Sequence, residues 1–269
     1  MIRIALPNKG RLAEGAKELL ERAGLSLDVR DRALQAQLGA DFVALFVNAR
    51  DIPEFVADGA ADLGITGGDL VAESGRPVDV LLDLGFGRCR LAVAARDDSG
   101  IGSVADIRNG ARVATVFPNL TRRFFEEAGR QITLVPISGA AEIAPHLGVA
   151  DIIVDLVSTG STLKVNGLVE VEQLLESAAQ LIGRRELLQT ETGAKRVREL
   201  VAALESVLRA QNQRYLMANV PKRALTEIKR ILPGINGPTI LDVMDGGEFV
   251  AAHAVVDQRD IYRTIAELK

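Results

Sequence analysis

Residues 151–167 read DIIVDLVSTGSTLKVNG, an apolar run that leads into hydroxyl side chains around one glycine. Alternation along the run places Asp151, Ile153 and Asp155 on one side of a predicted strand. The segment STGST then offers four hydroxyl groups, and Gly160 lets several backbone N–H groups converge on one anion. The pattern predicts a phosphate-binding loop at the end of a buried strand. The alternative is an ordinary strand-to-helix turn in which a serine or threonine caps the helix.

An alternation of strands and helices extends from this stretch over most of the chain. Strands are expected over 2–6, 42–47, 62–67, 89–95, 111–116 and 133–137, and helices over 11–23, 52–59, 67–75, 103–109, 121–129 and 138–146. Asp69 and Ser138 are expected to cap their helices. The order predicts an α/β protein whose parallel sheets form two lobes, divided near Gly87. Ligands bind beyond the carboxyl ends of such strands, which here are the loops 7–11, 67–69, 117–120, 138–142 and 158–162.

The pattern changes after residue 188. A long amphipathic helix over 197–211 precedes a strand (215–221), a helix (222–232), two strands (238–244 and 249–256) joined by the turn 245–248, and a helix (260–268). This order is most of a ferredoxin-like unit. The sequence ends before the expected last strand, which predicts an unpaired sheet edge.

Composition narrows the class of protein. The 269 residues carry a net charge of −4, which argues against binding nucleic acid through phosphate neutralisation. A single cysteine, Cys89, excludes a disulfide within the chain and a cysteine metal cluster, and two histidines, His146 and His253, make a histidine-rich zinc site improbable and fit structural roles better. Charged residues interrupt every apolar run before it reaches the length of a membrane span. We therefore expect a cytoplasmic enzyme or binding protein.

A resemblance to a known family rests on IVDLVSTGST at 153–162. This segment resembles the phosphoribosyl-pyrophosphate (PRPP) motif of phosphoribosyltransferases, but type I enzymes usually carry two adjacent acids where this chain has Asp155 and Leu156. The form VDLVSTGSTL followed by NGL is instead similar to ATP phosphoribosyltransferase, the first enzyme of histidine biosynthesis. Further segments agree in order: PNKGRL (7–12), ARDIPEFV (49–56), DLGITGGDL (62–70), LGFGRCRL (84–91), FPNLTRRFF (117–125) and GAAEIAPHLGVAD (139–151). QRYLMANVP (213–221) and LPGINGPTI (232–240) resemble the long form of the family.

The resemblance implies a catalytic core of the type II periplasmic-binding-protein class and an ACT-like regulatory domain without its last strand. Lobe I is expected to span 1–88 and 170–190, and lobe II, with the PRPP loop, 89–169. The linker helix and regulatory domain are expected over 191–269.

The same resemblance assigns roles to residues. Transfer of 5-phosphoribosyl from PRPP to N1 of ATP would release pyrophosphate. Implied for PRPP are the acids Glu142 and Asp155 on the ribose and, on the 5-phosphate, Ser158, Thr159, Gly160, Ser161 and Thr162. Implied for ATP are Lys9, Arg11, Arg50, Asp69 and Leu70, and the catalytic set would be Lys9, Glu142 and Asp155. Mg²⁺ would be held mainly by substrate phosphates, so no protein metal site is predicted. Without the resemblance, Lys9 and Arg50 would be interpreted as solvated surface charges, and Asp69 as the N-cap of its helix.

Regulation is implied in the same way. Family members bind histidine in the C-terminal domain, which favours a less active hexamer over dimers. Asn219 and Thr239 occupy places of histidine contacts, whereas Gly237 stands where relatives often carry serine. Together with the missing strand, this predicts weakened histidine feedback. Phe117 stands where some relatives carry tyrosine, which leaves stacking on the nucleotide as its expected role.

Two other functions remain open from the residues. A two-lobed cleft also suits a non-catalytic solute-binding receptor, although that function leaves STGST unexplained and no export signal is visible. A type I phosphoribosyltransferase acting on a purine or orotate is the second alternative, and the single acid before Leu156 argues against it.

Overall fold

The structure is a computed structural model that describes residues 1–27, 33–232, 237–243 and 247–269. Within these residues the chain forms two compact units, Met1–Val201 and Ala202–Lys269. The first unit contains two sheets, each the centre of one lobe.

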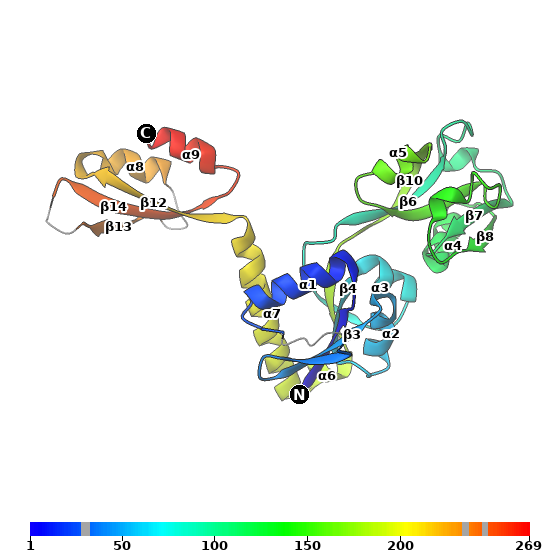
Figure 1. Cartoon of the computed structure of the whole chain (residues 1–269), viewed down its shortest axis with the longest axis horizontal. Coiled ribbons are helices and arrows are strands. Elements are labelled where there is room, and N and C mark those ends of the chain that lie inside the picture. The colour runs from blue at the N-terminus through cyan, green and yellow to red at the C-terminus, as the bar shows by residue number, and fades with distance from the viewer. Residues whose placement is uncertain (28–32, 233–236, 244–246) are drawn as a thin grey trace. The chain divides into compact units, whose positions relative to one another are not determined.

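The first lobe is built on a six-stranded mixed sheet (Figure 1, blue to cyan, with β11 in yellow-green). Its strand order is β2 (Gln35–Leu38), β3 (Phe42–Val47), β1 (Ile2–Pro7), β4 (Leu63–Gly67), β11 (Ala179–Gly183) and β5 (Asp79–Asp83). Its helical segments are α1 (Gly10–Arg22), η1 (Ala49–Asp51), α2 (Ile52–Ala57) and α3 (Gly68–Ser74). Of the apolar runs predicted as strands, β1 and β4 are buried on both faces and β3 is partly buried, while α1 buries Ala16, Leu19 and Leu20. Since β1 runs parallel to β3 and β4, their carboxyl ends meet at one edge of the sheet.

The second lobe is built on a five-stranded sheet (Figure 1, green). Its strand order is β10 (Leu168–Ser177), β6 (Cys89–Arg96), β9 (Ile152–Val157), β7 (Ala111–Thr115) and β8 (Ile132–Pro136), and its helical segments are η2 (Val104–Asp106), α4 (Pro118–Glu127), η3 (Ala141–Ile143) and α5 (Ser161–Val165). The middle strand β9 is the apolar run quoted first, and Ile152, Ile153 and Val154 are fully buried there. Burial on both faces explains why this run is continuous rather than alternating.

Several expectations are corrected. Strand β10 pairs with β6, so the chain returns to the first lobe at Ala179 and not at residue 170. The sheets are mixed, because β6 runs antiparallel to β9. The helix expected over 138–146 is only the three-residue turn η3, preceded by Ala140 in the left-handed region and followed by Pro145, which disfavours a longer helix. The helix expected over 103–109 is likewise only the turn η2.

The linker and the second unit follow the predicted order. After α6 (Arg185–Gln189) and the long helix α7 (Glu191–Gln211) come β12 (Gln213–Pro221), η4 (Lys222–Ala224), α8 (Leu225–Ile231), β13 (Thr239–Asp242), β14 (Phe249–Asp257) and α9 (Ile261–Glu267). The three described strands form an antiparallel sheet in the order β12-β14-β13. One face carries the apolar core of this unit, with Val220, Ile228 and Val250. The predicted turn over 245–248 lies partly outside the described residues.

A buried ion-pair network ties the first lobe together at Asp62. The residue is 7 % exposed, and its carboxylate accepts hydrogen bonds from the Arg3 backbone N–H (2.9 Å) and from Nη2 of Arg184 (3.0 Å). Burial alone would raise the pKa of Asp62, but the hydrogen bonds and charges of Arg3 and Arg184 hold it below its usual value. Asp62 thereby connects the segments that flank β1, β4 and β11.

We expect Asp62→Asn to lower the unfolding free energy by about 2–3 kcal/mol near neutral pH, because the partners of a buried carboxylate lose their charge complement. A lowered pKa gives stability that is present above the unfolded-state value of 3.8 and is lost as pH falls through the folded-state value. The deficit should therefore shrink in acid. Urea denaturation near neutral pH and in acid measures the difference in unfolding free energy between wild type and Asp62→Asn. Asp58→Asn, at an exposed position, is the control. An equal deficit at both pH values would contradict the electrostatic explanation.

Candidate active site

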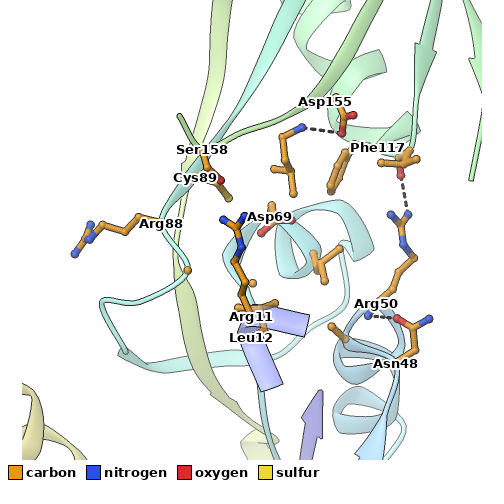
Figure 2. A pocket seen from close by; sticks show the side chains of 16 residues that line it. Arg11, Leu12, Asn48, Arg50, Asp69, Arg88, Cys89, Phe117, Asp155 and Ser158 are labelled. Atoms are coloured by element: carbon orange, nitrogen blue, oxygen red, sulfur yellow. Dashed lines mark hydrogen bonds between the residues drawn. The ribbon is translucent and has the colours of Figure 1, made fainter. Parts of the chain in front are cut away.

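Two adjoining cavities lie where the loops of both lobes meet. The larger measures about 380 Å³, within the range of small-molecule sites (Figure 2). Side chains from the first lobe that line it are Arg11, Arg50, Asp69 and Leu70, and those from the second lobe are Phe117, Asp155 and Ser158. Arg88 and Cys89, at the start of β6, also line it. They lie in the segment LGFGRCRL, but no site role was predicted for either.

The smaller cavity measures about 170 Å³ and is lined by the STGST loop (158–162), Glu142, Asp155 and Arg11. The structure thus brings together all the residues predicted for PRPP, although η3 and α5 are separate segments. Arg11, Asp155 and Ser158 line both cavities. The two cavities therefore share part of their walls.

The loop geometry differs from the ordinary helix cap, in which a serine or threonine occupies the N-cap position itself. The N-cap residue of α5 is Gly160, so no serine or threonine side chain occupies that position. Gly160 adopts φ +77°, the left-handed region in which glycine is favoured. The Thr159 and Ser161 hydroxyls lie 2.9 Å apart, and both side chains are exposed, as is that of Thr162. The Ser161 N–H donates to Thr159 Oγ1 at 3.4 Å. The other N–H groups of the first turn have no intrahelical acceptor, so this loop combines hydroxyl and amide donors.

Asp155 sits at the carboxyl end of β9, partly buried, with Oδ1 accepting the Leu156 N–H at 2.8 Å. Burial raises the pKa of Asp155 above its usual value and the neighbouring Glu142 adds to this, while the Leu156 N–H and Arg50 oppose it. Ala140, just before η3, holds φ +52°, which costs an L-residue about 1–2 kcal/mol and is typical of constrained functional segments. The two acids form a site that favours hydroxyl donors or cations.

The three basic residues predicted to bind ATP differ in their positions relative to the two cavities. Arg11 lines both cavities. Arg50 reaches across to the second lobe, donates from Nη1 to the Val116 carbonyl (2.7 Å) and lies 5.5 Å from the centre of the Phe117 ring (Figure 2). Lys9 is exposed at the N-cap of α1 and is outside the described linings of both cavities. Phe117 is only 1 % exposed, so a nucleobase can stack on it only if its cover moves.

Asp69 differs from its expected role as a helix cap, because the N-cap of α3 is Gly67 and Asp69 lies inside the first turn. Its carboxylate is buried and accepts the Ser177 hydroxyl at 2.6 Å, while that hydroxyl accepts the Asp69 N–H at 2.9 Å. Asp69 thus bonds to the end of β10 while it lines the larger cavity. Ser177, far away in sequence, carried no signal of this role.

The residues predicted to bind histidine lie in the second unit. Asn219 on β12 is opposite Ala251 of β14, and Thr239 on β13 is opposite His253. Because residues 251 and 253 point to the same side of β14, Asn219 and Thr239 share one exposed sheet face. His253 contacts the Tyr215 hydroxyl, and Nε2 of His146 lies 2.7 Å from the Asn166 carbonyl, which fits structural roles for both histidines.

The described residues limit two other possibilities. Among them, no group of three or more histidine, cysteine, aspartate or glutamate side chains is arranged to hold a metal ion. Of the helices in the described ranges, none is both long and apolar enough to cross a membrane.

The fold and the cleft site define a two-lobed α/β protein of the type II periplasmic-binding-protein class. The periplasmic aliphatic sulphonate binding protein SsuA from Escherichia coli shares this fold at 14 % identity, over 78 % of this chain and 72 % of that one (TM-score 0.50). Residues 48–206 match the family model described as ATP phosphoribosyltransferase, and residues 210–269 match the HisG C-terminal domain. The chain belongs to the ATP phosphoribosyltransferase family, in its long form.

Individual relatives agree. The ATP phosphoribosyltransferase of Gemmatimonas aurantiaca is 58 % identical, over 100 % of this chain and 94 % of its own length. The ATP phosphoribosyl transferase (HisG:HisZ) complex from Thermotoga maritima contains a chain with a TM-score of 0.70 and 28 % identity, covering 78 % of this chain and 100 % of that one. Membership of this family makes the chain a transferase of histidine biosynthesis and excludes the receptor and type I alternatives.

Proposed function

We propose that this enzyme transfers the 5-phosphoribosyl group of PRPP to N1 of ATP and releases pyrophosphate, as the first step of histidine biosynthesis. The observation that carries the proposal is the pair of cavities that share Arg11 and Asp155. One is lined by a hydroxyl-rich loop that suits a sugar phosphate, and the other has the size of a nucleotide site. The substrates are cytoplasmic metabolites, so the enzyme would act in the cytoplasm.

In the donor site, Ser158, Thr159, Gly160, Ser161 and Thr162 would bind the 5-phosphate. Glu142 and Asp155 would accept hydrogen bonds from the ribose hydroxyls. These bonds would offset part of the electrostatic repulsion between the two carboxylates. Together, the phosphate-binding loop and the two acids would hold the anomeric carbon of PRPP at the shared wall of the two cavities.

In the acceptor site, ATP would occupy the larger cavity, with Asp69 and Leu70 beside the nucleotide and Lys9, Arg11 and Arg50 near the phosphates. N1 of adenine forms the new bond to the anomeric carbon as the bond to pyrophosphate breaks, through a transition state with oxocarbenium character. Since N1 carries a lone pair, the attack requires no general base. Positioning and charge stabilisation then supply most of the rate enhancement.

The donor set fits Mg²⁺ carried by substrate phosphates. The smaller cavity offers the carboxylates Glu142 and Asp155, and no third acid is found among its described lining residues. Mg²⁺ commonly keeps several waters and binds one or two carboxylates plus phosphates. When bound, the ion would neutralise charge on the leaving pyrophosphate.

Regulation by histidine is part of the proposal. Histidine would bind the second unit at Asn219 and Thr239, which share one exposed sheet face. Binding would favour hexamers over dimers and lower activity.

Pyrophosphate release in the presence of ATP, PRPP and Mg²⁺ tests the proposal. We expect release only when both substrates are present, loss of release after chelation of the metal, and weak inhibition by added histidine. GTP is the matched acceptor control, because its N1 carries a proton and has no free lone pair. Binding of ATP and PRPP without release, or release with a free nucleobase in place of ATP, would contradict the reaction.

A further inference from the structure

A buried carboxylate of the first lobe, Glu73 near the end of α3, caps a helix of the second lobe. Its Oε1 accepts the Asn119 N–H and its Oε2 accepts the Leu120 N–H, both at 2.9 Å. The Asn119 side-chain amide returns a hydrogen bond to the Glu73 carbonyl at 3.0 Å. Glu73 is 9 % exposed. These N–H groups belong to the first turn of α4, whose N-cap residue Phe117 supplies no acceptor side chain.

The capped turn is also part of the acceptor cavity. It connects β7 to α4 and carries Val116 and Phe117, which line the larger cavity. Arg50 holds the same turn through its bond to the Val116 carbonyl and its contact with the Phe117 ring. The first lobe therefore holds this turn from two elements, η1 and α3.

We propose that Glu73 is a positioning residue that sets the separation of the lobes and thereby the width of the nucleotide cavity. Each carboxylate oxygen satisfies one backbone donor, and a charged acceptor at a helix N-terminus gains from the helix dipole. A glutamine offers one oxygen and one NH₂ group, so one of the two N–H groups would face another donor. The lobes would then lose this contact, and the Phe117 wall would move relative to Asp69 and Leu70.

The kinetic test rests on the proposed reaction. For Glu73→Gln we expect KM for ATP to rise about tenfold, which is the size of the loss of a charge-assisted bond. KM for PRPP should stay within about twofold, because Arg11 is the one residue of the first lobe in the described lining of the smaller cavity. Glu73→Asp keeps the charge with a shorter reach, and Asn119→Ala removes the return bond together with a 3.4 Å hydrogen bond from Arg122 Nη1 within α4. Both should shift KM for ATP in the same direction by less. Glu126→Gln, exposed on the same helix, is the matched control and should behave as wild type.

A second readout is independent of catalysis. Spin labels at Glu18→Cys on α1 and Thr133→Cys on β8, both exposed, report the distance between the lobes in a Cys89→Ala background. We expect Glu73→Gln to shift or broaden this distance in the ligand-free protein and Glu126→Gln to leave it unchanged. An unchanged distance, or an equal rise in both KM values, would overturn the proposal and leave Glu73 a purely stabilising residue. If the wild type shows no turnover, the proposed reaction fails, while the distances still decide the role of Glu73. If Glu73→Gln does not fold, Glu73→Asp and Asn119→Ala carry both measurements.

Discussion

Asp155→Asn is expected to lower kcat/KM for PRPP by about 100- to 1,000-fold, because precise placement and charge at the reacting carbon supply much of the proposed rate. The carboxylate lines both cavities, and one of its oxygens already accepts the Leu156 N–H. The remaining lone pairs are available for ribose hydroxyls. An asparagine has one acceptor oxygen, so keeping the Leu156 bond leaves an NH₂ group facing the sugar.

The same substitution is expected to raise the melting temperature of the free protein at neutral pH. A raised carboxyl pKa means that the folded state binds the proton more tightly than the unfolded state does. Stability is then highest below the unfolded-state pKa and is lost as pH rises through the folded-state pKa. Asparagine has no charge to desolvate, so its advantage should be small near pH 4 and larger near pH 7. Thermal unfolding at both pH values measures the difference.

Asp151→Asn is the matched control, because Asp151 directly precedes the strand that carries Asp155. Asp151 bonds to Arg112 and Arg108, which hold its pKa at about 2. Asp151→Asn should lower the melting temperature and leave turnover unchanged, whereas Asp155→Asn should raise the melting temperature and lower turnover. If Asp155→Asn kept wild-type turnover, Asp155 would not contact the ribose.

The strands predicted correctly are those whose own sequence is a short apolar run, because such a run indicates a buried strand. The run at β9 is apolar from Ile152 to Val154, where both faces of the strand are covered, and covering is incomplete only at Asp155 and Leu156. Strand β10, LVEVEQLLES, alternates irregularly and pairs with β6 through register shifts, so its own pattern does not show which sheet it joins. The η3 region resembles a helix until Pro145, and its path depends on Ala140 in a conformation that side-chain patterning does not predict.

The candidate site divides in the same way. Loops that follow strands were located correctly, because parallel strands bring their carboxyl ends together and the STGST loop needs a glycine at φ > 0. The partners of Asp69 and Glu73 could not be predicted. Ser177 lies 108 residues from Asp69, and Glu73 binds backbone N–H groups that leave no trace in the side chains of α4. Such contacts follow from the way the lobes pack and not from local patterns.

Gly160→Val should abolish measurable turnover and binding of PRPP while the protein remains folded. A Cβ added at Gly160 would meet only the Val157 side chain, at 3.9 Å, so the difficulty is conformational and not steric crowding. A β-branched residue is strongly disfavoured at φ +77°, and the loop would relax to another backbone conformation. The amide and hydroxyl donors of the loop would then no longer converge on the 5-phosphate. Titration with PRPP and the pyrophosphate-release assay measure the two losses.

Gly110→Val separates the loss of this site from general strain. Gly110 has φ +80° and open space around its Cβ position, and it is outside the described linings of both cavities. The two variants should therefore lose similar stability, about 1–2 kcal/mol, whereas only Gly160→Val loses PRPP binding. Thr162→Val, which removes one hydroxyl from the same loop without a demand on φ, should weaken PRPP binding by less. Equal activity in the two glycine variants would mean that the STGST loop does not bind the phosphate, and the proposed donor site would have to lie elsewhere in the cleft.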